Sequence, residues 1–105
     1  MKHLREVTGS EAGLSGDEQI RIALRRIIKR GGEAQMADLY DALETYVQAQ
    51  GFSLSLQGRA SLRRCVNRDA ITLGYIEPHD PNRPGWRITP EGRKFMEISL
   101  GRTSV

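Results

Sequence analysis

The segment from Ser55 to Gly74 constrains the fold most, because its apolar and polar residues separate onto two sides of a helix. At about 100° per residue, the mostly apolar side consists of Leu62, Cys65, Val66, Asp69 and Leu73, with Ala70 near its edge. The opposite side consists of Gln57, Ser61, Arg64 and Arg68, flanked by Asn67. Such a helix must pack its apolar side against other elements, so we expect it inside a helical domain.

The polar side of this segment carries residue types that recognise nucleic acids. Arginine binds guanine or phosphate, glutamine and asparagine bind adenine, and serine contacts either base edges or phosphates. The segment holds four arginines and a single aspartate. An ordinary solvated surface helix shows the same two-sided pattern. Taken alone, the segment favours that simpler interpretation. The features of the rest of the chain favour nucleic-acid binding.

Length and composition predict one globular domain. A chain of 105 residues can bury one modest core, and 38% hydrophobic with 28% charged residues is ordinary for a globular protein. No apolar run approaches the ~20 residues of a membrane span, and the first residues lack the apolar core of a signal peptide. We therefore expect a cytoplasmic protein without a membrane partner.

Basic charge is concentrated in the second half of the chain. The formal net charge is only +3. Residues 1–54 hold seven Lys or Arg and eight Asp or Glu, whereas residues 55–105 hold nine and five. The basic excess therefore coincides with the proposed recognition helix, as expected for a surface that approaches nucleic acid.

Catalytic and metal-binding patterns are missing from the sequence. Cys65 is the single cysteine, and its position on the apolar side predicts a small buried hydrophobe. Neither His3 nor His79 has cysteine or acidic neighbours at the spacings that hold zinc. No nucleophile–base set, paired carboxylates or phosphate-binding loop can be found. We expect no enzymatic activity, no cofactor, no metal and no small-molecule substrate.

Capping and turn residues predict the order of elements. Ser15 and Glu18 form a capping box for a first helix, which ends at Gly31. A second helix is expected to start near Met36 and to end at Gly51. The complete prediction is helix, short extended link at 33–35, helix, the 55–73 helix, a hairpin of strands 75–77 and 86–89 around a loop at 79–85, and a closing helix from 90.

The carboxy-terminal part resembles winged helix-turn-helix DNA-binding domains. The segments Gly74-Tyr75-Ile76 and Gly85-Trp86-Arg87-Ile88-Thr89-Pro90-Glu91-Gly92-Arg93 are similar to the wing of that family, which ends in an aromatic residue, a strand and a Thr-x-x-Gly-Arg turn. Leu39-Tyr40-Asp41 and Leu62-Arg63-Arg64 are also similar to the amino-terminal domain of Mrr-type restriction endonucleases. We expect no counterpart of their nuclease half after residue 100.

The resemblance implies a mainly α fold with a small β-hairpin, that is, a winged helix over residues 15–100. Residues 1–14 are expected to form a flexible arm and residues 101–105 a flexible tail. The third helix would enter the major groove, and the 79–85 wing would touch the backbone or minor groove. Implied helix contacts are Gln57, Arg59, Ser61, Arg64, Asn67 and Arg68, with Arg63 facing phosphate. Implied wing contacts are His79, Asn82, Arg83 and Arg87.

Some residues of the wing have a different implied role. Trp86 matches the family aromatic and is assigned to packing under the wing. Asp80 at the tip is unfavourable beside phosphate, and Pro81 and Pro84 stiffen the loop. These departures weaken the expected wing contact more than the helix contact.

Two classes of function remain open. The first is duplex DNA binding as a small transcriptional regulator or DNA-targeting module, strengthened by homodimerisation on a two-fold site; structured RNA is a variant of it. The alternative is a protein–protein interaction adaptor that binds no nucleic acid. In that alternative the arginines meet an acidic protein, and Ile22 and Ile71, which lie on polar faces, mark an apolar contact.

Overall fold

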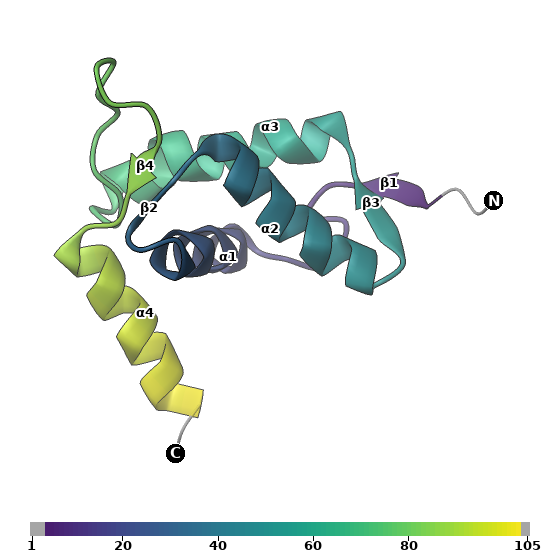
Figure 1. Cartoon of the computed structure of the whole chain (residues 1–105). Coiled ribbons are helices and arrows are strands. Elements are labelled where there is room, and N and C mark those ends of the chain that lie inside the picture. The colour runs from purple at the N-terminus through teal and green to yellow at the C-terminus, as the bar shows by residue number, and fades with distance from the viewer. Residues whose placement is uncertain (1–3, 104–105) are drawn as a thin grey trace.

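The computed structural model describes residues 4–103, and the side chains of residues 4–98. This part of the chain is mainly helical, as predicted (Figure 1). Its α-helices are α1 (Gly16–Lys29), α2 (Met36–Ala49), α3 (Leu56–Arg64) and α4 (Pro90–Thr103), and the π-helix η1 (Cys65–Ala70) continues α3. Its strands are β1 (Arg5–Val7), β2 (Glu33–Ala34), β3 (Phe52–Leu54) and β4 (Trp86–Arg87).

The strands form two small sheets on different sides of the helices. β1 pairs in parallel with β3, with Val7 opposite Leu54. β2 pairs antiparallel with β4, with Glu33 opposite Arg87. Figure 1 shows α3 along the upper edge of the molecule and the loop after it projecting beyond that edge, whereas α4 extends away on the lower side.

The first helix follows the predicted local chemistry. The Ser15 hydroxyl accepts from the Glu18 amide, and the Glu18 carboxylate accepts from the Ser15 amide, each at 3.1 Å. At the other end, Gly31 adopts a φ of +91° and the Gly32 amide donates to the Ile27 carbonyl, which is the geometry that ends helices at glycine. The buried apolar side chains of α1 and α2 then meet in one core, which includes Leu24, Ile27, Leu39, Leu43 and Val47.

The amino-terminal segment differs from the expected flexible arm. Residues 5–7 form β1, and Val7 and Leu14 are buried in the core. The Leu14 amide donates to the Gly9 carbonyl, which closes a turn. The buried Gln19 side chain of α1 donates to the Leu14 carbonyl at 3.4 Å. This segment packs against the helices because Val7 and Leu14 contact core residues that are distant in sequence. Residues 1–3 lie outside the described part of the chain.

The third helix is wound differently from the prediction. Its buried seam consists of Gly58, Leu62, Val66 and Ala70, so Ala70 lies at the centre of the packed side, while Leu73 is 51% exposed. Residues four apart drift by about 40° per step around an ordinary α-helix. The wider π turns of η1 offset this drift, so that the seam stays against the core and residues beyond it rotate outward.

Gly58 marks the point where the amino-terminal segment crosses α3. A Cβ atom at this position would stand 2.6 Å from Leu54 Cδ1 and 3.0 Å from both the Thr8 Cα and the Val7 carbonyl oxygen. Alanine normally stabilises a helix by about 1 kcal/mol relative to glycine. We expect Gly58→Ala instead to lower the free energy of unfolding by about 1–3 kcal/mol, because backbone atoms cannot move aside cheaply.

The control for this substitution is Gly16→Ala in the first turn of α1. There the added methyl group meets no atom within 4 Å, so the free energy of unfolding should stay constant or rise slightly. Urea denaturation of the two variants checks the pair. Equal midpoints would contradict the packing of the amino-terminal segment on α3.

The predicted hairpin is present in a reduced form. Ile76 and Ile88 form an isolated bridge, and the Glu77 amide donates to the Arg87 carbonyl at 3.0 Å. The ladder partner of Trp86–Arg87 is β2 rather than the strand predicted at 75–77. The hairpin is therefore attached to the helical body through the segment between α1 and α2.

The closing helix begins at Pro90, as predicted, and is locked to the hairpin base. The Thr89 hydroxyl donates to the Gly74 carbonyl and accepts from the Gly92 amide. A Cβ at residue 92 would collide with the Tyr75 carbonyl oxygen, which explains the glycine. α4 runs to Thr103, so residues 101–103 are helical where a flexible tail is predicted, and residues 104–105 are not described.

Candidate nucleic-acid interface

The exposed polar side chains of α3 and η1 form one surface, which we call the donor face. Leu62 and Val66 are completely buried on the opposite side of the helix. This packing turns the polar side chains outward. α3 itself runs along the upper edge of the molecule in Figure 1. The exposed members of the donor face are Gln57, Arg63, Arg64, Asn67 and Arg68.

The arginines of the donor face are available to a ligand. Within the described residues, no carboxylate pairs with Arg63 or Arg64, and the Arg64 guanidinium donates only to the Ser61 hydroxyl, at 3.4 Å. Arg68 pairs with its neighbour Asp69 at 3.1 Å, but its side chain is 70% exposed. Exposed pairs of this kind contribute at most about 1 kcal/mol. A phosphate could therefore replace Asp69 as the partner at little cost.

Arg59 and Ser61 are less exposed than the other predicted contacts of α3 and η1. The Arg59 guanidinium lies 3.7 Å from a Glu44 carboxylate oxygen and 5.5 Å from the centre of the Tyr40 ring. It therefore ties α3 to α2 at the edge of the donor face. Ser61 is half-buried and serves as the acceptor for Arg64.

Leu56 is a further residue of this surface, and the sequence does not predict its exposure. It is 82% exposed at the first position of α3, next to Gln57. Phe52, Leu54 and Leu56 are apolar at every second position, a pattern that predicts side chains on one buried side. A helical wheel started at Leu56 would have placed it about 120° away from Leu62, outside the buried seam.

The projecting loop supplies exposed polar side chains at one end of the donor face. His79, Asn82 and Arg83 are exposed. The Asp80 carboxylate accepts from the Asn82 amide at 2.9 Å, and the Asp80 carbonyl accepts from the Arg83 amide at 3.0 Å. Asp80, which the prediction regards as unfavourable, thus orders the turn that presents its neighbours.

Arg87 is not available as a wing contact, contrary to the prediction. Its residue is 8% exposed, and its guanidinium pairs with Glu33 at 3.0 Å and with Glu77 at 3.5 Å. The cause is the β2–β4 pairing, which sets Glu33 directly across from it. Trp86, in contrast, is buried as expected, with the His79 ring 5.5 Å away.

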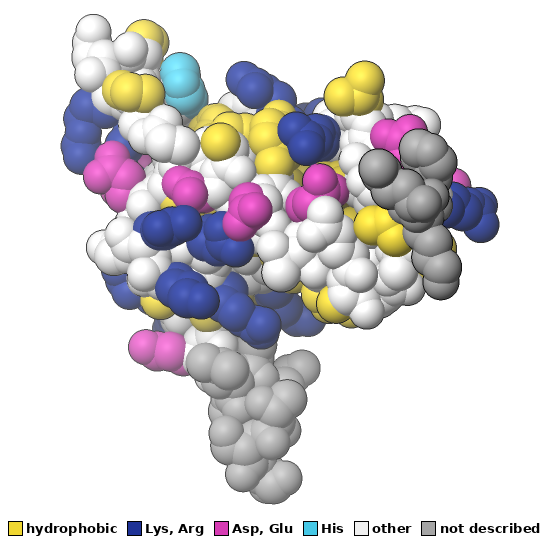
Figure 2. Space-filling view, turned by 45° about the vertical axis from the view of Figure 1, so that its right-hand side comes forward, with side chains coloured by type: hydrophobic (Ala, Val, Ile, Leu, Met, Phe, Trp, Pro, Cys, Tyr) yellow, Lys and Arg dark blue, Asp and Glu magenta, His cyan; other side chains and the backbone are white. Residues whose placement is uncertain are grey.

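The acidic residues of α2 form ion pairs with arginines of the same chain. Asp38, Asp41 and Glu44 pair with Arg30, Arg26 and Arg59, respectively. Figure 2 shows acidic side chains in a row across the middle of one face of the molecule, with Lys and Arg gathered beneath them. In the described part of the chain, no group of three metal-ligating side chains occurs.

Cys65 lies at the edge of the buried side of η1 and is half-buried. Burial raises the pKa of its thiol, and the nearby Asp69 carboxylate raises it further, whereas Arg64 and Arg68 act in the opposite direction. A raised pKa lowers the thiolate fraction at a given pH. The site is therefore poorly suited to nucleophilic or redox chemistry.

We expect the Cys65 thiol to react with a chromogenic disulfide reagent several-fold more slowly in the folded protein than in the same chain in urea. At about pH 8 an ordinary cysteine is partly ionised, and the rate in the folded protein should rise steeply as the pH increases further. Stopped-flow absorbance in buffer and in urea provides the comparison. Equal rates in both states would contradict the partial burial of Cys65.

Comparison with known proteins adds no relative: no family model, curated protein or solved structure matches this chain. Between residues 4 and 103, none of the helices combines the length and the apolar character that crossing a membrane requires.

Proposed function

We propose that this protein binds duplex DNA, with α3 and η1 in the major groove and the 79–85 loop on the adjacent backbone or minor groove. The observation that carries the proposal is the donor face, where Arg63 and Arg64 are exposed without an acidic partner among the described residues. The proposal includes a winged helix-turn-helix arrangement, in which α1 and α2 support α3 and η1, α4 packs on α1, and the loop is the wing.

The dimensions and chemistry of the donor face support this proposal. An α-helix with side chains is about 10–12 Å across, which suits the B-DNA major groove of about 12 Å. The face combines arginines with Gln57 and Asn67, which are the residue types that recognise guanine, adenine and phosphate. Because the helix is held by a buried seam on its opposite side, its donors would reach a duplex without unfolding any packed element.

The biological role that fits such a module is transcriptional regulation or the targeting of a larger system to DNA. A single domain with a few phosphate contacts binds nonspecific DNA weakly, with a Kd of roughly 10⁻⁴–10⁻⁶ M at physiological salt. Binding as a homodimer to a two-fold site would add affinity and specificity.

Titration of a fluorescent random-sequence duplex at several salt concentrations tests the proposal. Neutralising three phosphates with Arg63, Arg64 and Arg68 predicts a slope of log K against log salt of about −3. Competition with duplex RNA and with single-stranded DNA identifies the preferred nucleic acid. If no salt-sensitive binding is measured at micromolar protein in low salt, the proposal is wrong and the adaptor alternative is favoured.

A further inference from the structure

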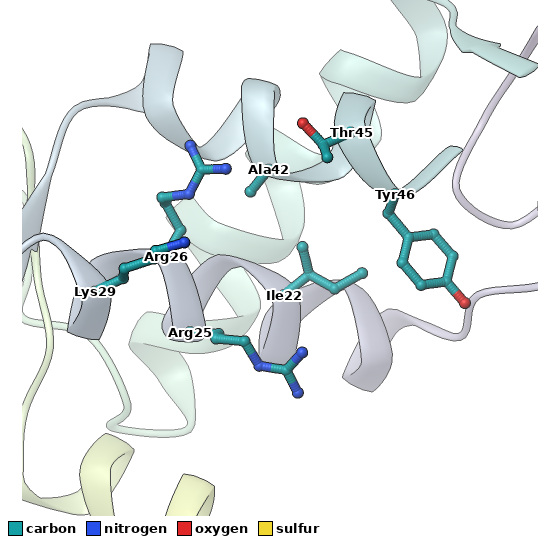
Figure 3. Close-up of a pocket in the computed structure, with 7 residues that line it drawn as sticks. All are labelled: Ile22, Arg25, Arg26, Lys29, Ala42, Thr45 and Tyr46. Carbon is teal, nitrogen blue, oxygen red and sulfur yellow. The ribbon is translucent and has the colours of Figure 1, made fainter. Parts of the chain in front are cut away.

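A hollow between α1 and α2 lies on a different surface from the donor face. All of its lining residues come from these two helices, and none from α3, η1 or the projecting loop. Figure 3 shows Ile22 pointing between the helices toward Ala42, with the Tyr46 ring at one end and Arg26 and Lys29 at the other. The hollow has a volume of about 220 Å³, enough for one or two apolar side chains.

The wall of this hollow is apolar in its middle. Ile22 and Ala42 are half-buried. Tyr46 is 40% exposed. Ile22 and Ile71, which the adaptor alternative groups together, are both partly buried against the core, but only Ile22 lines this hollow. A protein surface with a concave apolar centre typically receives an apolar side chain of a partner.

The edge of the hollow carries positive charge that the protein does not neutralise. Arg26 pairs with Asp41 at 2.9 Å. Arg25 and Lys29 are exposed, and within the described residues neither has an acidic partner. The α2 acids pair with Arg26, Arg30 and Arg59 of the same chain, so they do not neutralise Arg25 or Lys29.

We propose that this α1–α2 groove docks an acidic amphipathic helix from another protein. One apolar side chain of that helix packs between Ile22 and Tyr46, and its flanking carboxylates meet Arg25 and Lys29. This is the helix-in-groove mode of recognition, with charge complementarity selecting an acidic partner over a basic one. Since the donor face contributes nothing to the groove, a DNA-bound molecule would still recruit the partner.

The test uses two fluorescein-labelled designed helical peptides with leucine at the i, i+3, i+4 and i+7 positions. One carries glutamate on both flanks of the leucine stripe, and the other carries lysine at the same positions. Fluorescence anisotropy should show the acidic peptide binding the full chain about tenfold or more tightly than the basic peptide. This ratio corresponds to ~1.4 kcal/mol, which two exposed ion pairs can supply.

Variants locate the binding site on the protein. Arg25→Glu/Lys29→Glu should abolish binding of the acidic peptide, and Tyr46→Ala should weaken it severalfold, while circular dichroism stays unchanged because all three side chains are exposed. The matched control, Arg93→Glu/Lys94→Glu, makes the same charge change at two exposed positions of α4. It should leave binding within about twofold, because neither residue lines the groove.

Three outcomes would overturn the inference. The first is equal binding of both peptides, and the second is an equal loss in the α4 control, which would reduce the effect to overall charge. The third is a dimer in analytical ultracentrifugation that Tyr46→Ala dissociates, which would assign the groove to a second copy of the chain. None of these outcomes bears on DNA binding, because the readouts use separate surfaces.

Discussion

Replacing Arg64 and Arg68 together with alanine is expected to lower the affinity for random duplex DNA at least tenfold. Both side chains are exposed on the donor face, and Arg64 has no acidic partner in the described chain. Each lost phosphate contact reduces the number of released counterions, so the salt slope should become shallower by about 2. The free energy of unfolding should change by no more than about 0.5 kcal/mol per site, as is usual for exposed positions.

A second pair of cations provides the matched control for this result. Arg25→Ala/Lys29→Ala removes the same charge from the α1–α2 groove, which shares no residue with the donor face. We expect its DNA affinity to stay within about twofold of the parent protein, since long-range attraction between exposed charges is largely screened at physiological salt. Parallel anisotropy titrations compare the two. An equal loss in both variants would show that net charge, and not the donor face, governs binding.

Replacing Leu62 with alanine is expected to lower the free energy of unfolding by about 2–5 kcal/mol. Leu62 is completely buried in the seam that holds α3 against the core, so truncation leaves a cavity beneath the donor face. Leu56 provides the control within the same helix, because its side chain is 82% exposed. Leu56→Ala should change the free energy of unfolding by no more than about 0.5 kcal/mol.

Urea denaturation followed by circular dichroism measures both leucine variants. The pair separates burial from helix propensity, since the substitution and the helix are the same in both. If Leu56→Ala were as destabilising as Leu62→Ala, the orientation of α3 would be wrong, and with it the outward presentation of Arg63 and Arg64. The same experiment therefore tests the geometric basis of the proposed DNA binding.

Ion pairs between distant segments decide which arginines lack an acidic partner. Arg59, Arg64 and Arg87 are all arginines, and all three are predicted DNA contacts from the sequence. In the folded chain Arg87 faces Glu33, and Arg59 faces Glu44. Their carboxylate partners are 54 and 15 positions away in sequence, a separation that periodicity and local motifs do not register.

Local chemistry alone determined the elements with clear ends. Ser15, Ser55 and Thr89 supply hydroxyls that accept from the free amides of α1, α3 and α4, and Gly31 supplies the left-handed residue at the end of α1. Interactions of this kind span three to five residues, so they can be read from the sequence directly. The sequence likewise determined the two-sided character of residues 55–70.

Tertiary structure alone decided the docking of residues 5–14 as β1 and a buried turn, the π winding of η1 and the burial of Arg87. Each depends on a partner supplied from a distant part of the chain: β3 for the first, the core beneath α3 for the second and Glu33 on β2 for the third. Short-range preferences set where helices begin and end, but long-range packing and pairing set which side chains remain exposed to meet a ligand.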